Sequence, residues 1–201
     1  MLRYDAIPTA VSDLLLRLAP HVALRDFALG GGTSLALRFG HRWSVDLDFF
    51  TLTDFQPEDL FLELALHPAT ITARASHSLS IDVGGVKLDL LRHAYPLLRP
   101  VERHDEVTLI SLPDIAAMKL NAIANRGSKK DFFDLAVLLD HFPLPEMIGY
   151  FTGKYASADP FTVIRSLAWF EDAESEPDPV ALDGRTWAGV RDRARAAVAG
   201  L

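Results

Sequence analysis

Cysteine is absent from the 201-residue chain. Its absence excludes disulfide bonds, thiolate metal sites and thiol nucleophiles. The chain also lacks an apolar run near the ~20 residues that a membrane-spanning helix needs, and Asp5 and Asp13 interrupt the N-terminal segment where a signal peptide would be apolar. We therefore expect a cytoplasmic protein with no membrane partner, whose metal ions would be bound by oxygen or histidine.

Positive charge is also scarce, since the formal net charge is −7. Proteins that coat nucleic acid nonspecifically need clustered Lys and Arg, so that class is disfavoured, although a local basic site is compatible with this balance. No G-x-S-x-G or H-E-x-x-H motif occurs, which leaves hydrolase nucleophiles and helix-borne zinc without a signal. With 49% hydrophobic residues the chain can form a globular core.

Strands and helices alternate in the first half, whereas helical spacing dominates the second. The pattern predicts an α/β (α+β) core over residues 1–110 and a helical part over 111–201, packed on the core. The expected helices cover 8–19, 35–39, 56–67, 112–127, 128–142, 143–151, 159–170 and 185–199. The expected strands are 42–49 and a hairpin within 69–93 that turns on Gly84 and Gly85. Residues 171–179 read as an acidic connector, and Trp169, Phe170 and Trp187 as helix-packing residues.

A glycine turn precedes an unusual strand in "GGGTSLALRFGHRWSVDLDFF", residues 30–50. Strict alternation places Arg42, Ser44, Asp46 and Asp48 on one face of this strand. Carboxylates at i and i+2 can converge on a shared cation, and without one they repel. Two structural alternatives remain: a turn that needs glycine only for its backbone, and an exposed edge strand carrying charges that prevent aggregation.

Asp89 is the best candidate for a third carboxylate. It lies in "GGVKLDLLRH" among apolar residues, where a charge needs a partner. Together with Asp46 and Asp48 it could bind two magnesium ions that activate a hydroxyl and screen a triphosphate. Asp82 is a competing candidate, but its place before the glycines favours a role in the turn.

These motifs, in this order, resemble the polymerase-β-type nucleotidyltransferase superfamily: Gly31-Gly32, thirteen residues, Asp46-Leu47-Asp48, and later Asp89. The stretches "LGGGTSLALRFGHRWSVDLDFF", "LPDIAAMKLNAIANRGSKKDFFDL" and "WFEDAESEPDP" are similar to the AbiEii/AbiGii nucleotidyltransferase toxins of type IV toxin–antitoxin and abortive-infection systems. The resemblance covers most of residues 25–190. It implies a polymerase-β-like core with a mixed sheet.

The resemblance also implies the chemistry. The enzyme would transfer a nucleoside monophosphate from an NTP to an acceptor hydroxyl with Mg²⁺ or Mn²⁺, releasing pyrophosphate. The acceptor would be tRNA or another RNA, and a separate antitoxin would be the partner. The implied catalytic residues are Asp46, Asp48, Asp89, Lys119, Lys130, Asp131 and Asp134, the first three as metal ligands. The implied nucleotide-binding residues are Gly31, Gly32, Thr33, Ser34, Arg42, Ser44, Lys119 and Arg126.

The helical motif residues also have plain structural explanations. Lys119 shares a helix face with apolar residues, so it either contacts an anion or extends to solvent. Ser128 and Asp131 fit the start of a helix, where acids are favoured. Transfer to a protein or small molecule, and a catalytically silent fold that only binds a partner, remain the alternative functions.

Overall fold

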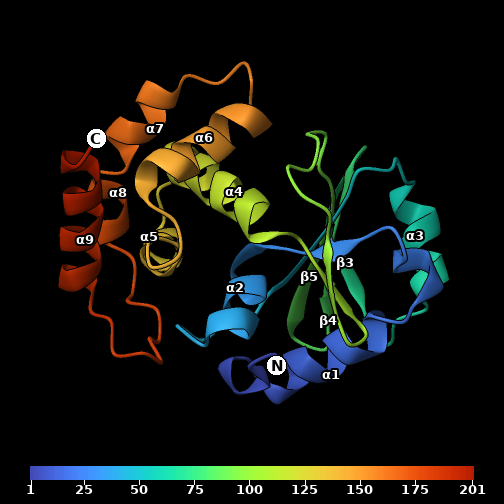
Figure 1. The fold of residues 1–201 in the computed structure, drawn as a ribbon. Helices are drawn as coiled ribbons and strands as arrows, with labels where there is room; N and C mark the ends of the chain where they lie inside the picture. Colours follow the sequence, from blue (N-terminus) through green and yellow to red (C-terminus); the bar gives the residue numbers. More distant parts are fainter. The chain divides into compact units, whose positions relative to one another are not determined.

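The computed structural model describes residues 1–201, and the chain divides into two compact units. Unit 1 comprises Met1–Arg38, Ser44–Pro96 and Pro100–Ile110. Unit 2 comprises Phe39–Trp43, Leu97–Arg99 and Ser111–Leu201. Figure 1 shows the helices and strands of both units.

Unit 1 contains a mixed seven-stranded sheet with the order β3-β4-β5-β2-β1-β7-β6. The β2–β5 and β1–β7 pairs are parallel, and the other neighbours are antiparallel. The predicted α/β class and mixed sheet are therefore confirmed. The strands are β1 (Ala28–Leu29), β2 (Leu47–Thr51), β3 (Thr70–Ala75), β4 (Ser78–Val83), β5 (Val86–Arg92), β6 (Glu102–His104) and β7 (Val107–Leu109).

One face of this sheet is covered by α1 (Thr9–Leu18) and α3 (Pro57–Leu64). Val11 and three leucines at helical spacing on α1 share a buried apolar cluster with Leu47 and Phe49 of β2 and Leu88 and Leu90 of β5. Since side chains alternate along a strand, the residues between these buried side chains of β2 and β5 lie on the opposite face of the sheet. Those residues include both Asp48 and Asp89. Unit 1 also contains α2 (Gly31–Phe39, whose last residue is counted with unit 2) and the short 3₁₀ helices Tyr4–Ala6 and Val22–Leu24.

The glycine hairpin forms as predicted, because Val83 pairs with Val86 across Gly84 and Gly85, which both have positive φ. Asp82 accepts a hydrogen bond from the Gly85 N–H at 3.1 Å, as expected of a turn residue. The sequence pattern did not reveal that residues 70–75 form a further antiparallel strand, β3, beside β4.

The strand predicted over residues 42–49 was given too early a start. β2 begins only at Leu47, and Arg42 forms an isolated bridge with Ala181 instead. The alternation fails with it, because Arg42 and Ser44 are buried whereas Val45 is 49% exposed. Arg42 and Ser44 therefore do not share an exposed polar face with Asp48.

Unit 2 is helical, as predicted. Its helices are α4 (Leu112–Asn125), α5 (Lys129–Leu138), α6 (Leu144–Lys154), α7 (Pro160–Ser166), α8 (Glu171–Glu174) and α9 (Trp187–Ala199). α4 packs against α5, α6 and α7, and α9 packs against α5. The connector expected at 171–179 starts with the short helix α8, which the acidic composition concealed.

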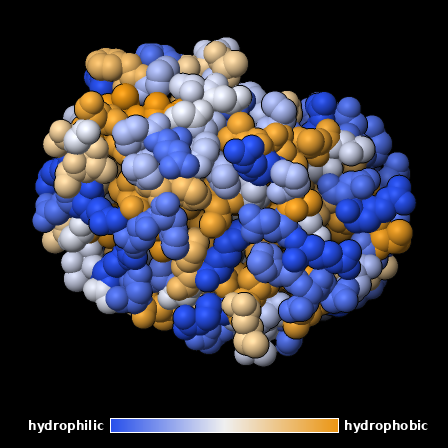
Figure 2. All heavy atoms as spheres, viewed as in Figure 1, coloured by the Kyte–Doolittle hydropathy of each residue, from blue (hydrophilic) through white to orange (hydrophobic).

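The aromatic residues of unit 2 divide into two groups. Trp187 and Phe170 are buried and pack on Phe132 and each other, as predicted. Trp169, however, is 52% exposed, so its predicted packing role is wrong. No helix in the structure is both long enough and apolar enough to cross a membrane, and Figure 2 shows hydrophilic and hydrophobic side chains interspersed on the face in view.

Candidate active site

Asp48 and Asp89 occupy facing positions on two adjacent parallel strands. In the register of β2 and β5, Asp48 lies directly opposite Asp89. Neighbouring strands are about 4.8 Å apart, and side chains at paired positions lie on the same face. The apolar neighbours of both aspartates are buried on the opposite face. Unit 1 thus brings two of the three predicted metal ligands together, and Asp46 lies two residues before Asp48, just ahead of β2.

The Asp89 carboxylate has one oxygen satisfied and one not. Its Oδ2 accepts a hydrogen bond from Lys87 Nζ at 2.7 Å, whereas its Oδ1 is buried and has no hydrogen-bond partner. The hydrogen bond to Asp89 raises the pKa of Lys87 despite some burial, and the charges of Asp89, Asp48 and Asp46 add to this effect.

These residues fit a divalent cation. Mg²⁺ and Mn²⁺ prefer carboxylate oxygens, and a buried carboxylate oxygen without a donor costs free energy unless a ligand satisfies it. Asp48 and Asp89 would hold the ion, with Asp46 close by in sequence.

The glycine turn lies directly against Asp48. The Gly30 N–H donates to the Asp48 carbonyl oxygen at 2.8 Å. Gly31 has φ +63°, and a Cβ at this position would be only 2.2 Å from Asp48 Oδ2. Glycine is thus required at residue 31 for two reasons, the left-handed backbone and the carboxylate that fills the side-chain space. The first turn of α2, including Gly32, starts beside this carboxylate.

The hydroxyls that follow the glycines are used inside unit 1. Thr33 and Ser34 are both buried. Thr33 Oγ1 donates to the Asp46 carbonyl oxygen and lies 2.8 Å from Ser44 Oγ. Ser34 Oγ accepts a hydrogen bond from Arg38, whose guanidinium also donates to Glu102 at 3.0 Å. These contacts hold the turn and the Asp46 backbone together, and the phosphate contacts predicted for the two hydroxyls stay a prediction.

Arg42 lies in unit 2, where it forms a two-pronged ion pair with Asp134. Its Nε and Nη2 donate to the two Asp134 oxygens at 2.7 and 2.9 Å, and its Nη1 donates to the Trp43 carbonyl oxygen at 3.1 Å. Both side chains are almost fully buried. A planar guanidinium suits this geometry better than any other side chain.

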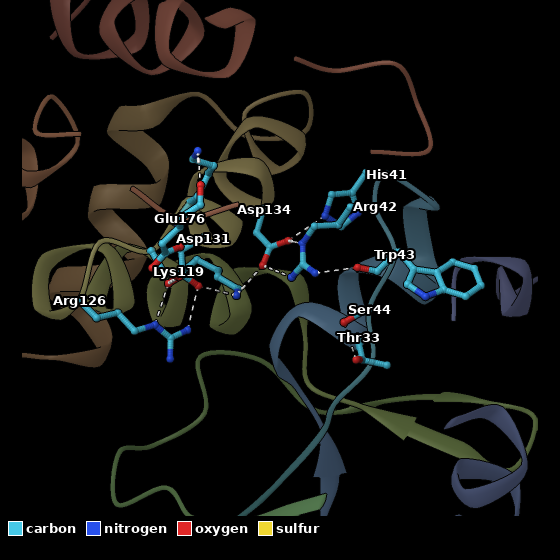
Figure 3. Close-up of polar contacts among 12 residues, drawn as sticks. Thr33, His41, Arg42, Trp43, Ser44, Lys119, Arg126, Asp131, Asp134 and Glu176 are labelled. Carbon is cyan, nitrogen blue, oxygen red and sulfur yellow. Dashed lines mark hydrogen bonds and ion pairs between the residues drawn. The ribbon is translucent and has the colours of Figure 1, made fainter. Parts of the chain in front are cut away.

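Lys119 of α4 joins both aspartates of α5. Its Nζ is 3.0 Å from Asp131 Oδ1 and 2.5 Å from Asp134 Oδ2. Figure 3 shows Lys119 pointing toward both aspartates. Burial would lower the pKa of Lys119, but the charges of Asp134 and Asp131 raise it overall. Burial likewise opposes ionisation of Asp134, yet Arg42 and Lys119 hold the pKa of its carboxyl well below the usual range. Both groups are therefore charged.

Asp131 is similarly saturated with donors. It accepts hydrogen bonds from Arg126 Nε at 2.8 Å and Nη2 at 2.9 Å, and from Ser128 Oγ at 2.8 Å. Burial favours its neutral form, but the Lys119 charge and the Arg126 hydrogen bonds lower the pKa of Asp131 to about 2. Instead of capping the backbone, as a capping box would, the Ser128 hydroxyl bonds the Asp131 carboxylate.

The two neighbouring lysines of α5 differ. Lys129 is buried, and its Nζ contacts the Glu176 carbonyl oxygen at 2.6 Å and Asp178 Oδ1 at 2.9 Å. Lys130 is exposed. The roles predicted for Lys119, Lys130 and Arg126 toward phosphate stay predictions.

Sequence reasoning missed two buried polar residues of unit 2. His41 belongs to no recognisable motif, but it is buried and its Nε2 lies 2.8 Å from Asp134 Oδ1. Asp114 was not considered, although it accepts from Lys154 Nζ at 2.6 Å and from the Leu98 and Arg99 N–H groups. A charged residue on the apolar face of a predicted helix was the available signal for Asp114. His41 carried no local signal, because its partner is 93 residues away.

Comparison with protein families identifies the chain. A model described as "Nucleotidyl transferase AbiEii toxin, Type IV TA system" matches residues 13–77 and 68–193. The chain belongs to the AbiEii family. This confirms the resemblance inferred from the motifs, and it makes the protein a nucleotidyltransferase of a family of type IV toxins.

The chain is also similar to a curated protein and to two solved structures. Protein aq_aa25 of Aquifex aeolicus (strain VF5) is 37% identical over 159 residues, which cover 75% of this chain and 77% of that protein. The crystal structure of JHP933 from Helicobacter pylori has a TM-score of 0.59 at 17% identity, covering 100% of this chain and 95% of that one. MenT4, a nucleotidyltransferase toxin of Mycobacterium tuberculosis H37Rv, has a TM-score of 0.58 at 17% identity, covering 99% and 86%. At these identities the two structures establish the shared fold alone.

Proposed function

We propose that this AbiEii protein transfers a nucleoside monophosphate from an NTP to a hydroxyl of an RNA, with tRNA as the expected class, and that Asp46, Asp48 and Asp89 form its metal-binding and catalytic centre. The single observation that carries this proposal is the pairing of Asp48 with Asp89 across parallel strands, with Asp89 Oδ1 buried and without a donor. Since NTPs and RNA are cytoplasmic, the reaction would take place there.

The residues of unit 1 would divide the work. The first backbone N–H groups of α2, beside Asp48, are suited to phosphate because a helix N-terminus presents unpaired donors. Asp89 would accept the proton of the acceptor hydroxyl while the oxygen of that hydroxyl bonds to the α-phosphorus. The bond from the α-phosphorus to the oxygen that bridges the α- and β-phosphates breaks, and pyrophosphate leaves with that oxygen and the electron pair. Mg²⁺ or Mn²⁺ bound by the carboxylates would supply charge stabilisation for the triphosphate.

Family membership supports the biological role. In a type IV system the activity would be toxic and would be relieved by a separately encoded antitoxin, which is the protein partner we expect. Abortive infection is the corresponding cellular response. An adjacent reading frame for a winged-helix protein would support this role.

The test uses purified protein, α-labelled NTPs and Mg²⁺, with total tRNA and cell protein as separate acceptors. We expect labelled tRNA with the wild type and a loss of about 10³-fold with Asp48→Asn, since metal-bound charge is worth several kcal/mol in the transition state. Asp82→Asn is the matched control, because it removes the same charge from β4, which is separated from β2 by β5 and where Asp82 serves the turn. It should keep the wild-type rate.

Two outcomes would overturn parts of the proposal. Labelled protein with unlabelled RNA would show that the acceptor is a protein. Equal activity or equal Mg²⁺-dependent NTP binding in the wild type and in Asp48→Asn would show that the carboxylate pair is not the centre of the reaction.

A further inference from the structure

Lys87 supplies a positive charge to the carboxylate site of unit 1. It lies two residues before Asp89 on β5, so both side chains are on the same face of the sheet. Its Nζ donates to Asp89 Oδ2 at 2.7 Å. This hydrogen bond, together with the nearby charges of Asp48 and Asp46, raises the pKa of Lys87. The ammonium is therefore charged and lies among the same carboxylates that would hold a divalent ion.

The Lys87 ammonium has donors that are not used within the chain. An ammonium carries three N–H donors, and Asp89 is the only residue to which Lys87 Nζ donates a hydrogen bond. The side chain is 56% exposed, and its four-carbon stem can rotate. An anion from solution can thus reach Lys87 without any change in the buried apolar face of the sheet.

A divalent ion bound to Asp89 would compete with this ammonium. The same carboxylate attracts both cations, and like charges a few ångströms apart repel each other. Mg²⁺ binds oxygen at about 2.1 Å, so a phosphate oxygen next to Asp89 on the same ion would lie roughly 3 Å from the carboxylate oxygen. Lys87 Nζ lies at a similar distance from that carboxylate. A phosphate bound with the ion is therefore within reach of Lys87 after a rotation of its side chain alone.

The order of the strands favours the α-phosphate as this partner. The first N–H groups of α2 suit the β- and γ-phosphates, and α2 follows β1 in the chain. β1 and β5 lie on opposite sides of β2. β5 is therefore on the side of the carboxylates away from the leaving pyrophosphate, and Lys87 would meet the phosphate at which the bond is exchanged.

We propose that Lys87 is a catalytic residue that leaves Asp89 when Mg²⁺ or Mn²⁺ is bound and donates to a non-bridging oxygen of the NTP α-phosphate. This inference rests on the proposed function, since it assumes that the triphosphate binds at the carboxylate site. Negative charge on these oxygens must be stabilised in the transition state, and a cation beside them lowers the barrier. Lys87 stays protonated throughout, so it transfers no proton.

The test removes the charge in Lys87→Met and measures the metal and the phosphates separately on the full chain. Without nucleotide, Mn²⁺ affinity should rise in electron paramagnetic resonance titrations, because the competing charge is gone. At saturating Mg²⁺, calorimetry should show a fall of about 5- to 10-fold in affinity for an α,β-methylene NTP, which cannot be cleaved between these phosphates. Affinity for inorganic pyrophosphate, which has no α-phosphate, should stay within about twofold.

Turnover and two further variants complete the test. The kcat of Lys87→Met for labelled transfer should fall about 100-fold at saturating Mg²⁺, since the contact stabilises charge in the transition state. Lys87→Arg keeps the charge and should recover most of the affinity for the analogue. Arg17→Met is the matched control, because it removes an equal charge from the exposed surface of α1, and all four measurements should stay at wild-type values.

Several results would overturn this inference. Unchanged or higher analogue affinity and kcat in Lys87→Met would show that the lysine only competes with the ion. An equal loss for pyrophosphate would assign the contact to the leaving group, and a fall in Mn²⁺ affinity would show that Lys87 merely orients Asp89. A wild-type protein that binds neither Mn²⁺ nor the analogue would overturn the proposed function too. A wild type that binds both, with no weaker binding in Lys87→Met, overturns only the role of Lys87.

Discussion

The aspartates of the sheet and those of α5 have opposite surroundings. Asp134 is completely buried and is contacted by Arg42, His41 and Lys119, so each of its oxygens has a partner. Asp89 has the single ion pair with Lys87, which is half exposed, and a buried oxygen without a donor. Saturated carboxylates hold a fold together, whereas an unsatisfied buried oxygen indicates a place for a ligand. The carboxylates of α5 are thus satisfied within their own unit, whereas Asp89 keeps one oxygen without a donor. The catalytic roles predicted for Asp131 and Asp134 stay predictions.

The strongest way to break this comparison is to neutralise one aspartate of each kind. Asp134→Asn leaves Arg42 and Lys119 with too little negative charge in a buried site, so we expect the free energy of unfolding to fall by about 3–5 kcal/mol. Asp89→Asn removes only a partly exposed pair and relieves repulsion from Asp48, so it should change stability by less than about 1 kcal/mol. Urea unfolding of both variants measures the difference, and equal losses would contradict the distinction.

Two glycine variants compare the hairpin turn at Gly85 with the glycine turn that contacts Asp48 at Gly31. Gly31 and Gly85 both have positive φ, but a Cβ would collide with Asp48 only at residue 31, since nothing lies within 4 Å of one at residue 85. We expect Gly85→Ala to cost about 1 kcal/mol of stability for its backbone alone. Gly31→Ala should cost about 1–3 kcal/mol more because the carboxylate must move.

Gly31→Ala should also weaken Mn²⁺ binding, whereas Gly85→Ala should not. Thermal unfolding and Mn²⁺ titration followed by electron paramagnetic resonance provide both measurements. Similar behaviour of the two variants would show that the contact between residue 31 and Asp48 is unimportant.

Acid should lower the free energy of unfolding over the pH range in which Asp131 of α5 becomes protonated. The pKa of Asp131 is lowered from 3.8 to about 2 in the folded protein. A carboxyl group whose pKa is lower in the folded than in the unfolded protein stabilises the fold at pH values above its unfolded-state pKa. This contribution to the free energy of unfolding is lost as the pH falls through the folded-state pKa. We expect about 2 kcal/mol to be lost between about pH 4 and pH 2. In Asp131→Asn the slope of the unfolding free energy against pH should be smaller over this range, and an unchanged slope would contradict the assignment.

The smallest effect concerns Lys87, the cation beside Asp89. Lys87→Met removes a charge that competes with a metal ion for Asp89 Oδ2, so Mn²⁺ affinity should rise about fivefold, as expected for a partly exposed pair. Arg17→Met removes an equal charge from the exposed surface of α1 and is the control. Unchanged affinity in Lys87→Met, or an equal rise in Arg17→Met, would show that Lys87 does not compete.

Local patterns predicted what is encoded locally. The helices, the Gly84–Gly85 hairpin and the placement of Asp48 and Asp89 on strands follow from periodicity and turn chemistry within a few residues. The apolar residues around Asp89 also predicted that it would need a partner, although no pattern indicated that β2 and β5 would pair in the register that puts Asp48 opposite it.

Residues whose partners are distant in sequence could not be placed in this way. Arg42 fits a strand by alternation, but a buried guanidinium needs a carboxylate, and Asp134, 92 residues away, provides it. The two- and three-residue strands β1, β6 and β7 are too short to show a period, and they form because neighbouring strands supply their hydrogen bonds. Motif order revealed the family where single motifs were ambiguous.

The path of the chain between the two units limits how the protein can be divided experimentally. It crosses from one unit to the other at 38/39, 43/44, 96/97, 99/100 and 110/111. A fragment ending at residue 110 would keep Arg42 but lose Asp134, and would keep the Leu98 N–H but lose Asp114. Neither unit is therefore a module that a single cut could release, and studies of an isolated catalytic core would need redesigned 39–43 and 97–99 segments.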